Sequence, residues 1–526
     1  MPRQGRFSIT LSLEEKIGQM LVVGFHGLDP PDHILRWLAH GRIGGVILFA
    51  RNIDNPTQVA ELTQACHEAS SRPILIAIDQ EGGVVARLRE GFTESPGAMA
   101  LGVADSEEIA EGVSAVMGTE MRALGINWNL APALDLTHNI HNPSVGVRSL
   151  GTDPGRVAKL GVAQVLGFQK VGVAATAKHF PGKADTPIDP HVRLPVIKGS
   201  LDGMWETDLV PFRAASESGI AAVMITHVQF KALEPNYPST LSPRIIRGLL
   251  REEIGFHGLV TTDCMEMKAV TNEYGSGESA VLAALAGANT ILFSHTRESQ
   301  EAAYDALVDA ARTGRLPMEY IDFAVDKIQT VKERFAFKDR PSPDIIRHPD
   351  HLKITMEAAR AGTVLLENGS GLLPLRLEDS LRIALIEFRS HLDTKNPDQG
   401  YLTNFAASIN NRLPQVESIG LDPMTPSEGT LVRAREYASS SDIVIVATRN
   451  AHLNPEQNKL AQEFLRSGSR SVLICLRNPY DAGVLRGADA VICTCSDSAP
   501  SLTAAAEALI GRFTPKDKLP VPLRIE

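Results

Sequence analysis

The sequence has few cysteines, and none of them has the spacing of a disulfide framework or a zinc ribbon. They are odd in number and lie mostly in apolar runs, which is typical of reduced, buried thiols. Cys493 and Cys495 are separated by a single residue, so we assign both to a core. The sequence therefore predicts a fold without disulfides. The cysteines are Cys66, Cys264, Cys475, Cys493 and Cys495.

Long apolar runs and an excess of basic residues are also missing. No run reaches the length of a membrane span, and the amino terminus, MPRQGRFSIT, lacks the apolar core and cleavage pattern of a signal peptide. The 62 acidic residues outnumber the 52 basic residues, which gives a formal charge of -10 and a pI near 5.9. This balance argues against nucleic acid or an anionic membrane as the main partner. We expect a cytoplasmic protein.

Motifs of several cofactor-dependent and metal-dependent enzymes are missing as well. PGKADT contains Gly182-Lys183, but a phosphate-binding P-loop would need glycine at 177 and serine or threonine at 184, where alanine stands. His67-Glu68 has no second histidine at zincin spacing. No dinucleotide fingerprint follows a strand, and no G-x-S-x-G elbow has suitable triad partners. We therefore predict no cofactor and no metal.

From residue 18 to about residue 295, the sequence alternates short apolar runs with helix-length amphipathic stretches. Segments such as NPTQVAELTQACHEA place apolar residues at helical spacing behind a residue that favours a helix start. Eight such repeats over roughly 280 residues predict a (β/α)8 barrel of the TIM type. A doubly wound open sheet is the rival, but it rarely has eight successive parallel strands. The runs are 18–25, 44–50, 73–79, 126–135, 173–180, 221–228, 258–263 and 289–295.

The length of 526 residues exceeds one ordinary core, so at least two domains are expected. Residues 336–350 are polar and rich in proline, which indicates a linker between a barrel domain at 1–335 and a second domain at 351–526.

The pattern of the second domain favours an αβα sandwich. Its segment 354–366, ITMEAARAGTVLL, is interpreted as helical. We expect the domain to be structural or dimer-forming, and shaping the rim of the active site is the second alternative. The apolar runs of this domain are 381–388, 441–448, 471–479 and 488–494.

Polar side chains follow successive runs of the predicted barrel at the point where each run ends. Active sites of such barrels lie at the carboxyl ends of the strands, so we expect these side chains to lie together. Polar residues that merely mark strand ends would explain one or two of them, but not a different group at five successive ends. They are Asp79, with Gln80, Glu81 and Arg87 beyond it; Asp135, whose loop carries Asn142, Arg148 and Asp153; Lys178 and His179; His227; and Asp263.

The stretch KHFPGKADTPIDPHVRLP contains the most specific motif. Pro190 biases Asp189 towards an extended conformation, and residues two apart in an extended chain point to the same side. The Asp189 carboxylate is thus placed to bond one nitrogen of His191, which makes the histidine a candidate general acid/base. The alternative is a solvated loop with a chance Asp and His.

Asp263 closes the run GFHGLVTTD, and a helix is expected to begin in the following CMEMKAV. A carboxylate at a strand end facing a barrel opening is placed to attack or stabilise a developing cation. The alternative role is an N-cap of the following helix. The segment alone leaves both readings open.

These groups form a metal-free set of hydrogen-bonding side chains, which suits a polyhydroxylated ligand. A nucleophilic carboxylate with a separate acid/base is the equipment of a retaining glycosidase. An aspartate-supported histidine, with an ordinary pKa near 6.5, suits proton donation around neutral pH.

Four motifs in the same order resemble glycoside hydrolase family 3, and more narrowly its NagZ-like β-N-acetylglucosaminidases. They are IDQEGGVVARL, NPSVGVRSLGTDP, KHFPGKADTPIDPH and GFHGLVTTD. The resemblance covers nearly all of the first 340 residues, and the second domain is similar to the αβα domain of two-domain members.

The resemblance implies a role for each matched residue. Asp263 corresponds to the nucleophile that forms a glycosyl-enzyme intermediate, His191 to the acid/base, and Asp189 to its partner. The implied substrate carries terminal β-linked N-acetylglucosamine, in peptidoglycan fragments or chitooligosaccharides, and no cofactor is implied. Residues implied to hold the sugar are Asp79, Arg87, Arg148, Lys178 and His179.

The chain departs from the family pattern at a few positions. It has Lys183-Ala184 where the family usually has His-Gly, Pro190 where the family often has Ser, and Cys264-Met265 after Asp263 where many members have Asp-Leu. The alternatives are a glycoside phosphorylase, because a neutral or cationic acid/base repels phosphate less than a carboxylate does, a β-glucosidase or β-xylosidase, and a non-catalytic sugar-binding protein. We expect a monomer or homodimer.

Overall fold

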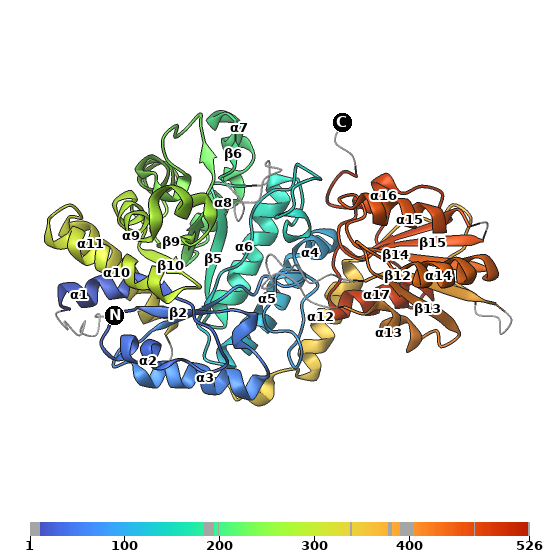
Figure 1. The fold of residues 1–526 in the computed structure, drawn as a ribbon, viewed down its shortest axis with the longest axis horizontal. Helices are drawn as coiled ribbons and strands as arrows, with labels where there is room; N and C mark the ends of the chain where they lie inside the picture. Colours follow the sequence, from blue (N-terminus) through green and yellow to red (C-terminus); the bar gives the residue numbers. More distant parts are fainter. Residues whose placement is uncertain are drawn as a thin grey trace.

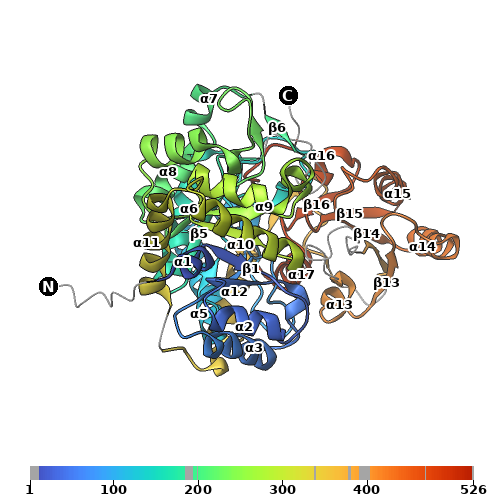
Figure 2. The same ribbon diagram turned by 60° about the vertical axis from the view of Figure 1, so that its left-hand side comes forward.

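The computed structural model describes residues 11–183, 194–197, 199–336, 339–376, 381–389, 403–467 and 469–523. It has two parts, a closed barrel formed by the first two thirds of the chain and a sheet flanked by helices formed by the carboxyl-terminal third (Figure 1). Seen from a second direction, the two parts lie side by side (Figure 2).

The barrel has eight parallel strands in the order β1-β10-β9-β7-β5-β4-β3-β2. Each predicted run supplies one strand, so the expectation of a (β/α)8 barrel is confirmed. The run 126–135 yields only a two-residue strand, because the chain leaves regular pairing at Leu130. The strands are β1 (Leu21–Val23), β2 (Gly45–Leu48), β3 (Leu75–Ile78), β4 (Trp128–Asn129), β5 (Ala174–Phe180), β7 (Ala222–Ile225), β9 (Leu259–Cys264) and β10 (Thr290–Phe293).

Helices surround the barrel and turn their apolar stripes inward, as the helical spacing of their sequences predicts. In α5, for example, Ala110, Val113 and Met117 are buried. A short pair of strands, β6 (Val196–Ile197) and β8 (Gln229–Phe230), lies outside the barrel. The helices are α1 (Leu13–Gln19), α2 (Asp32–Ala39), α3 (Pro56–Ala69), α4 (Ala98–Ala104), α5 (Glu107–Ala123), α6 (Pro154–Lys170), α7 (Leu201–Glu206), α8 (Leu209–Glu217), a π-helix (Arg244–Glu253), α9 (Lys268–Ala286), α10 (Arg297–Arg312) and α11 (Met318–Phe335).

The second part is a six-stranded sheet in the order β11-β16-β15-β14-β12-β13, parallel except for β11. One apolar cluster covers each face of the sheet, as in the predicted αβα sandwich. The strands are β11 (Val364–Glu367), β12 (Ile383–Phe388), β13 (Val416–Leu421), β14 (Ile443–Thr448), β15 (Arg470–Cys475) and β16 (Ala490–Cys493); the helices are α13 (Phe405–Asn410), α14 (Glu428–Ser440), α15 (Pro455–Leu465), α16 (Asp481–Val484) and α17 (Ala499–Leu509).

The sequence did not predict the two edge strands of this sheet. β13 has the sequence VESIGL, in which polar residues and a glycine interrupt the apolar ones, so it contains no continuous apolar run. β11 lies inside the segment 354–366 that was interpreted as helical, and that interpretation is wrong for its second half. Helix α12 (Pro349–Ala361) ends before Gly362, whose close approach to α4 leaves no room for a side chain: a Cβ would lie 2.7 Å from Cβ of Ala100.

Helix α12 connects the two parts. It contacts α4 and α5 of the barrel and α17 of the sandwich (Figure 1). His351 on α12 bonds Glu120 of α5 through Nδ1 at 2.8 Å, so part of this connection is polar. The division at 1–335, 336–350 and 351–526 remains a proposal.

The buried Lys332 of α11 makes the stability of the barrel depend on pH. Burial, with the charge of Arg72 adding to it, lowers the pKa of this amine to about 7, and its Nζ donates to Oε1 of Gln19 at 2.6 Å. Between about pH 7 and 10 the unfolded chain binds more protons at this group, so stability rises with pH. Lys332→Met should lack this rise, of at most about 1.4 kcal/mol per pH unit.

Urea unfolding of both proteins at pH 7 and pH 9 measures this difference. Lys327→Met, at a partly exposed position of the same helix, is the matched control and should keep the pH dependence of the wild type. If the unfolding free energy changes equally between pH 7 and pH 9 in the wild type and in Lys332→Met, Lys332 is charged when buried.

Candidate active site

A pocket of about 740 Å³ opens at the carboxyl ends of the barrel strands. The five predicted sugar-binding residues and Asp263 all line it, so the structure brings together groups that the sequence spreads over 185 positions. Its wall also contains apolar side chains, including Phe49, Leu130 and Met224. The charged residues of the lining are Asp79, Glu81, Arg87, Arg148, Lys178, Lys183 and Asp263, together with His179 and His295.

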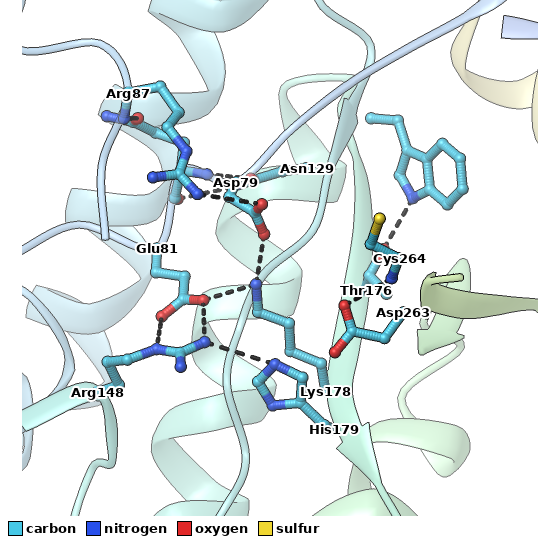
Figure 3. A network of polar contacts seen from close by, with 12 residues as sticks. Asp79, Glu81, Arg87, Asn129, Arg148, Thr176, Lys178, His179, Asp263 and Cys264 are labelled. Atoms are coloured by element: carbon cyan, nitrogen blue, oxygen red, sulfur yellow. Dashed lines mark hydrogen bonds and ion pairs between the residues drawn. The ribbon is translucent and has the colours of Figure 1, made fainter. Parts of the chain in front are cut away.

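The floor of the pocket is a network of ion pairs centred on Lys178 (Figure 3). Its Nζ lies 2.6 Å from Oδ1 of Asp79 and 2.6 Å from Oε1 of Glu81. Arg148 bonds both oxygens of Glu81, through Nη2 at 2.7 Å and Nε at 2.9 Å. Nη2 of Arg87 reaches Asp79 at 3.4 Å. Because these groups hold one another, the network presents fixed donors and acceptors to a ligand.

The network keeps its members charged. Burial alone would raise the pKa of Glu81, but Arg148 and Lys178 outweigh it and hold this pKa well below the ordinary value. Burial likewise opposes the charge of Lys178, yet Asp79 and Glu81 raise its pKa. Glu81 also helps to raise the pKa of Arg148 above its ordinary value, against burial. Glu81, Lys178 and Arg148 are therefore ionised at neutral pH.

His179 is fixed in orientation by Asp135. Its Nδ1 lies 2.6 Å from Oδ2 of Asp135, and Nε2 lies 3.4 Å from Nη2 of Arg148. Burial raises the pKa of Asp135 to about 6, although the nearby Lys183 and Arg148 act to lower it. Asp135 also accepts the backbone N–H groups of His179 and Lys183. Asp135 therefore fixes the backbone at the end of β5, where His179 and Lys183 line the pocket.

Asp263 stands at the end of β9, beside the floor network (Figure 3). Its Oδ1 accepts the N–H of Cys264 at 2.8 Å. The following helix, α9, starts at Lys268 and has Met267 at its N-cap position, so Asp263 does not cap it. The alternative that Asp263 is the N-cap of the following helix is therefore wrong. The carboxylate lines the pocket, where a nucleophile or an electrostatic stabiliser is needed.

Asp189 and His191 lie outside the described residues, so their pairing remains a prediction. His227 follows β7 but is committed elsewhere: its Nε2 lies 2.9 Å from the carbonyl oxygen of Cys264, and its Nδ1 lies 2.7 Å from Oγ1 of Thr240. We therefore assign His227 a role in holding the end of β9.

Three residues of the site, Glu81, Asp135 and Lys183, were given no catalytic or sugar-binding role from the sequence. Glu81 stands two positions after Asp79, and in an extended chain this spacing turns both carboxylates to the same side. The spacing could therefore have indicated that Glu81 faces the site together with Asp79. Asp135 was noted only as a strand end. Lys183 was noted as a departure from the family pattern, and the structure places it in the pocket wall.

Lys183 adds a positive charge to the pocket. The residue is 4% exposed, and its Nζ makes no hydrogen bond or ion pair within the part of the chain that the structure describes. Burial, and next the charge of Arg148, lower the pKa of this amine to about 8, while Asp135 and Asp263 act to raise it. An ammonium in a pocket wall that no described residue pairs with favours an anionic or strongly accepting ligand group.

The sandwich supports the loop that carries Arg148. Tyr480 OH lies 3.1 Å from Oγ1 of Thr137, and Val147 packs into the apolar cluster of the sandwich. Gly146 has φ +45°, and a Cβ there would lie 2.7 Å from Oδ1 of Asn478. The second domain thus contacts the residues next to Arg148, which supports the alternative of a domain that shapes the rim of the site.

Gly146→Ala should therefore reduce activity. The new methyl group meets Asn478 and strains a left-handed backbone, so the loop has to shift and Arg148 moves with it. We expect kcat/KM to fall by about 10- to 100-fold, since a displacement near 1 Å costs on that order. Steady-state kinetics on an aryl glycoside measure the loss.

The matched control is Gly155→Ala in α6, where a Cβ meets nothing closer than 3.4 Å. It should retain wild-type kinetics. The double variant Gly146→Ala/Asn478→Ala should recover part of the lost activity, because the clash is relieved while the backbone strain remains. Wild-type kinetics in Gly146→Ala would contradict the supporting role of the sandwich.

The described residues contain neither a candidate metal site nor a candidate membrane-spanning helix. No group of three or more His, Cys, Asp or Glu side chains among them is arranged to hold a metal ion. No helix in the described ranges is both long and apolar enough to cross a membrane.

Comparison with protein families matches the whole architecture. Residues 12–331 match the N-terminal domain of glycosyl hydrolase family 3, and residues 363–525 match the C-terminal domain of the same family. The fold, the charged pocket and these matches define a glycoside hydrolase built from a barrel and a sandwich. The chain belongs to glycoside hydrolase family 3, which confirms the resemblance seen in the sequence.

Several relatives are similar over long stretches. A β-hexosaminidase A from Pseudoalteromonas piscicida is 32% identical over 66% of this chain, and the alignment spans 63% of that protein. A β-hexosaminidase from Pseudomonas aeruginosa is 40% identical over 55% of this chain and 85% of its own length. The solved structure of a family 3 β-N-acetylglucosaminidase from a Paenibacillus species superimposes with a TM-score of 0.91, at 35% identity over 98% of this chain and all of the other.

Proposed function

We propose that the chain is an exo-acting, retaining β-N-acetylglucosaminidase that removes terminal β-linked N-acetylglucosamine from peptidoglycan fragments or chitooligosaccharides. The observation that carries this proposal is Asp263 at the end of β9, in the same pocket as the charged network around Lys178. The relatives named as β-hexosaminidases and a β-N-acetylglucosaminidase support N-acetylglucosamine as the sugar.

In the proposed mechanism, Asp263 attacks the anomeric carbon and forms a covalent glycosyl ester. His191, oriented by Asp189, protonates the departing oxygen and then removes a proton from the water that hydrolyses the ester. Two displacements at the same carbon retain the β configuration. An imidazolium near neutral pH supplies the proton without a strongly shifted pKa.

The floor network holds the sugar in this proposal. Asp79 accepts hydrogen bonds from sugar hydroxyls, while Arg87, Arg148 and Lys178 donate to hydroxyl and acetamido oxygens. His179 faces the same space and is held by Asp135. These groups are fixed before the ligand enters, so binding does not require them to reorganise.

A panel of aryl β-glycosides tests the sugar preference. We expect kcat/KM for the N-acetylglucosaminide to exceed that for the glucoside and the xyloside by about 100-fold or more, because the acetamido group adds hydrogen bonds that the other sugars lack. A higher rate on the glucoside or the xyloside would reassign the enzyme to those activities. Turnover of none of the three would favour a sugar-binding protein.

His191→Ala should separate good from poor leaving groups. An aryl oxygen leaves without protonation, whereas the sugar oxygen of chitobiose needs an acid. We expect kcat/KM on chitobiose to fall by about 10²- to 10⁴-fold, and the first step on an activated aryl glycoside to change much less. Chitobiose hydrolysis and burst kinetics on the aryl substrate measure the two effects.

The control for this variant is His257→Ala, an exposed histidine before β9, at the end of the barrel away from the pocket. It should behave as the wild type. If His191→Ala loses the same factor on both substrates, His191 is not the acid.

Lys183 favours phosphorolysis as a second candidate function. An incoming phosphate replaces the water of the second step, the ester bond from C1 to Asp263 breaks, and a bond from C1 to the phosphate oxygen forms. A β-glucoside phosphorylase structure superimposes with a TM-score of 0.82 at 25% identity over 98% of this chain. Assays with and without phosphate distinguish hydrolysis from phosphorolysis. Release of N-acetylglucosamine 1-phosphate that is reduced in Lys183→Met supports phosphorolysis. Release of free sugar alone excludes it.

The cytoplasm is the proposed location, and recycling of peptidoglycan fragments the proposed setting. The five cysteines are unpaired in the structure, which fits a reducing compartment. A monomer or homodimer remains the proposed state, and light scattering of the purified chain measures it.

A further inference from the structure

The sandwich has a cavity of its own at the carboxyl edge of its parallel strands. The strand order reverses between β12 and β14, because the chain places β13 on one side of β12 and then β14, β15 and β16 on the other. In open α/β sheets, ligands bind outside the carboxyl ends of the strands at such a reversal. The cavity lies there, is open to solvent and has a volume of about 710 Å³.

Three adjacent strands each deliver an arginine to this cavity. Arg389 directly follows β12, Arg449 directly follows β14, and Arg477 lies two residues beyond β15. Neighbouring strands are about 4.8 Å apart, so the three side chains start from a short stretch of the sheet edge. The described residues that line the cavity include no carboxylate. The remaining lining consists of amide and apolar side chains.

Two of these arginines are paired with carboxylates behind the cavity. Arg449 lies 2.9 Å from Glu387 and 3.3 Å from Asp497, and all three side chains are buried. Nε of Arg477 lies 3.7 Å from Asp497. The two carboxylates are therefore shared by Arg449 and Arg477, and neither of them pairs with Arg389.

Arg389 is the arginine of the three for which the described residues provide no ionic partner. Within the part of the chain that the structure describes, its guanidinium has no hydrogen bond or ion pair, and the residue is exposed. Its side chain lies across β13, where Gly420 leaves room for it: a Cβ at position 420 would be 2.0 Å from Nε of Arg389. Any residue larger than glycine on β13 at this point would displace the arginine.

We propose that this cavity binds a phosphoryl group, carried by inorganic phosphate or by a small phosphate ester. Guanidinium groups match phosphate oxygens in geometry and charge, and a dianion balances more than one arginine. Asn450, which lines the cavity next to Arg449, has a left-handed backbone with φ +60°, a strained state that is concentrated at binding sites. The exposed Met424 and Leu453 provide apolar surface at the rim for the organic part of an ester.

Calorimetric titration of the full chain with inorganic phosphate and with glycerol 3-phosphate tests this site. We expect saturable binding with a Kd below about 1 mM. Arg389→Gln and Arg477→Gln should each weaken it by about tenfold or more, as expected for the loss of a hydrogen bond to a charged group. Arg449 stays in place, because its removal would take away the cation that pairs with the buried Glu387.

Arg433→Gln, at an exposed position of α14 away from the cavity, is the matched control and should bind like the wild type. Lys183→Met is titrated in parallel, because phosphate can also meet Lys183 in the barrel pocket. Binding that persists in Lys183→Met and is lost in Arg389→Gln/Arg477→Gln assigns the site to the sandwich, independently of what the barrel catalyses. Unaltered thermal melting shows that each variant is folded.

The two probes separate the two sources of the phosphoryl group. Tighter binding of glycerol 3-phosphate identifies an ester whose organic part meets Met424 and Leu453, and equal affinity identifies free phosphate. The absence of saturable binding with either probe, or binding that survives in the double arginine variant, overturns the proposal.

Discussion

Asp263→Asn is expected to lower kcat/KM for an aryl β-N-acetylglucosaminide by about 10⁴-fold. The amide has nearly the size of the carboxylate, so the pocket keeps its shape. It carries no charge, however, and cannot form the ester with the anomeric carbon or stabilise the positive charge that develops there. Because Asp263 does not cap helix α9, the substitution should leave stability nearly unchanged. Initial rates and thermal melting measure both effects.

Glu266→Gln is the matched control. This carboxylate stands three positions beyond Asp263 and accepts the backbone N–H groups of His295 and Thr296. It does not line the pocket, so the variant should lose stability but keep kcat within a few-fold of the wild type. Equal turnover by wild type and Asp263→Asn would remove Asp263 as the nucleophile.

Lys178→Met should damage both folding and activity. The lysine is 2% exposed and is the ion-pair partner that Asp79 and Glu81 share. Its removal leaves two carboxylates in a buried site with less positive charge, which costs roughly 3–5 kcal/mol of stability. The sugar also loses a fixed donor, so kcat/KM should fall by about 10²- to 10³-fold. Urea unfolding and steady-state kinetics give the two quantities.

Raising the acidity of the buffer should recover part of the stability lost in Lys178→Met, because protonation removes the charge from the stranded carboxylates. The control is Lys170→Met, which breaks only the surface pair with Glu111 and should cost less than about 1 kcal/mol. If Lys178→Met has the same urea midpoint of unfolding as the wild type, the floor network contributes nothing to stability.

The sequence predicted the barrel because each strand is buried on both faces and so forms an apolar run that ends at a polar group. Asp79, Arg87, Arg148, Lys178, His179 and Asp263 were found by this rule, since parallel strands in a closed barrel bring their carboxyl ends to one rim. The rule identifies the side of the barrel on which a residue stands. It does not say which side chains form ion pairs with one another, so the position of Glu81 between Lys178 and Arg148 is known only from the structure.

Other features depend on contacts between distant segments, which no local pattern reports. Asn478 of the sandwich limits position 146 to glycine, and the two residues are 332 positions apart. Edge strand β13 mixes polar and apolar residues on both of its faces, so it contains no continuous apolar run and was not predicted. The sequence allowed Asp263 to be the N-cap of α9, and only the structure shows that this helix starts at Lys268. The role of the sandwich therefore had to come from three-dimensional contacts.

The central claim is that Asp263 bonds covalently to the sugar, and peptide mass spectrometry after inactivation tests it most directly. A 5-fluoro glycosyl fluoride of N-acetylglucosamine forms the ester quickly and releases it slowly, because fluorine destabilises the cationic transition state and fluoride leaves readily. Trypsin then yields the peptide 252–268, which contains Asp263 together with Glu252, Glu253 and Glu266. The account predicts a peptide heavier by one fluorosugar, with fragmentation placing the sugar on Asp263. A sugar on another residue, or none on any peptide of a fully inactivated enzyme, would contradict it.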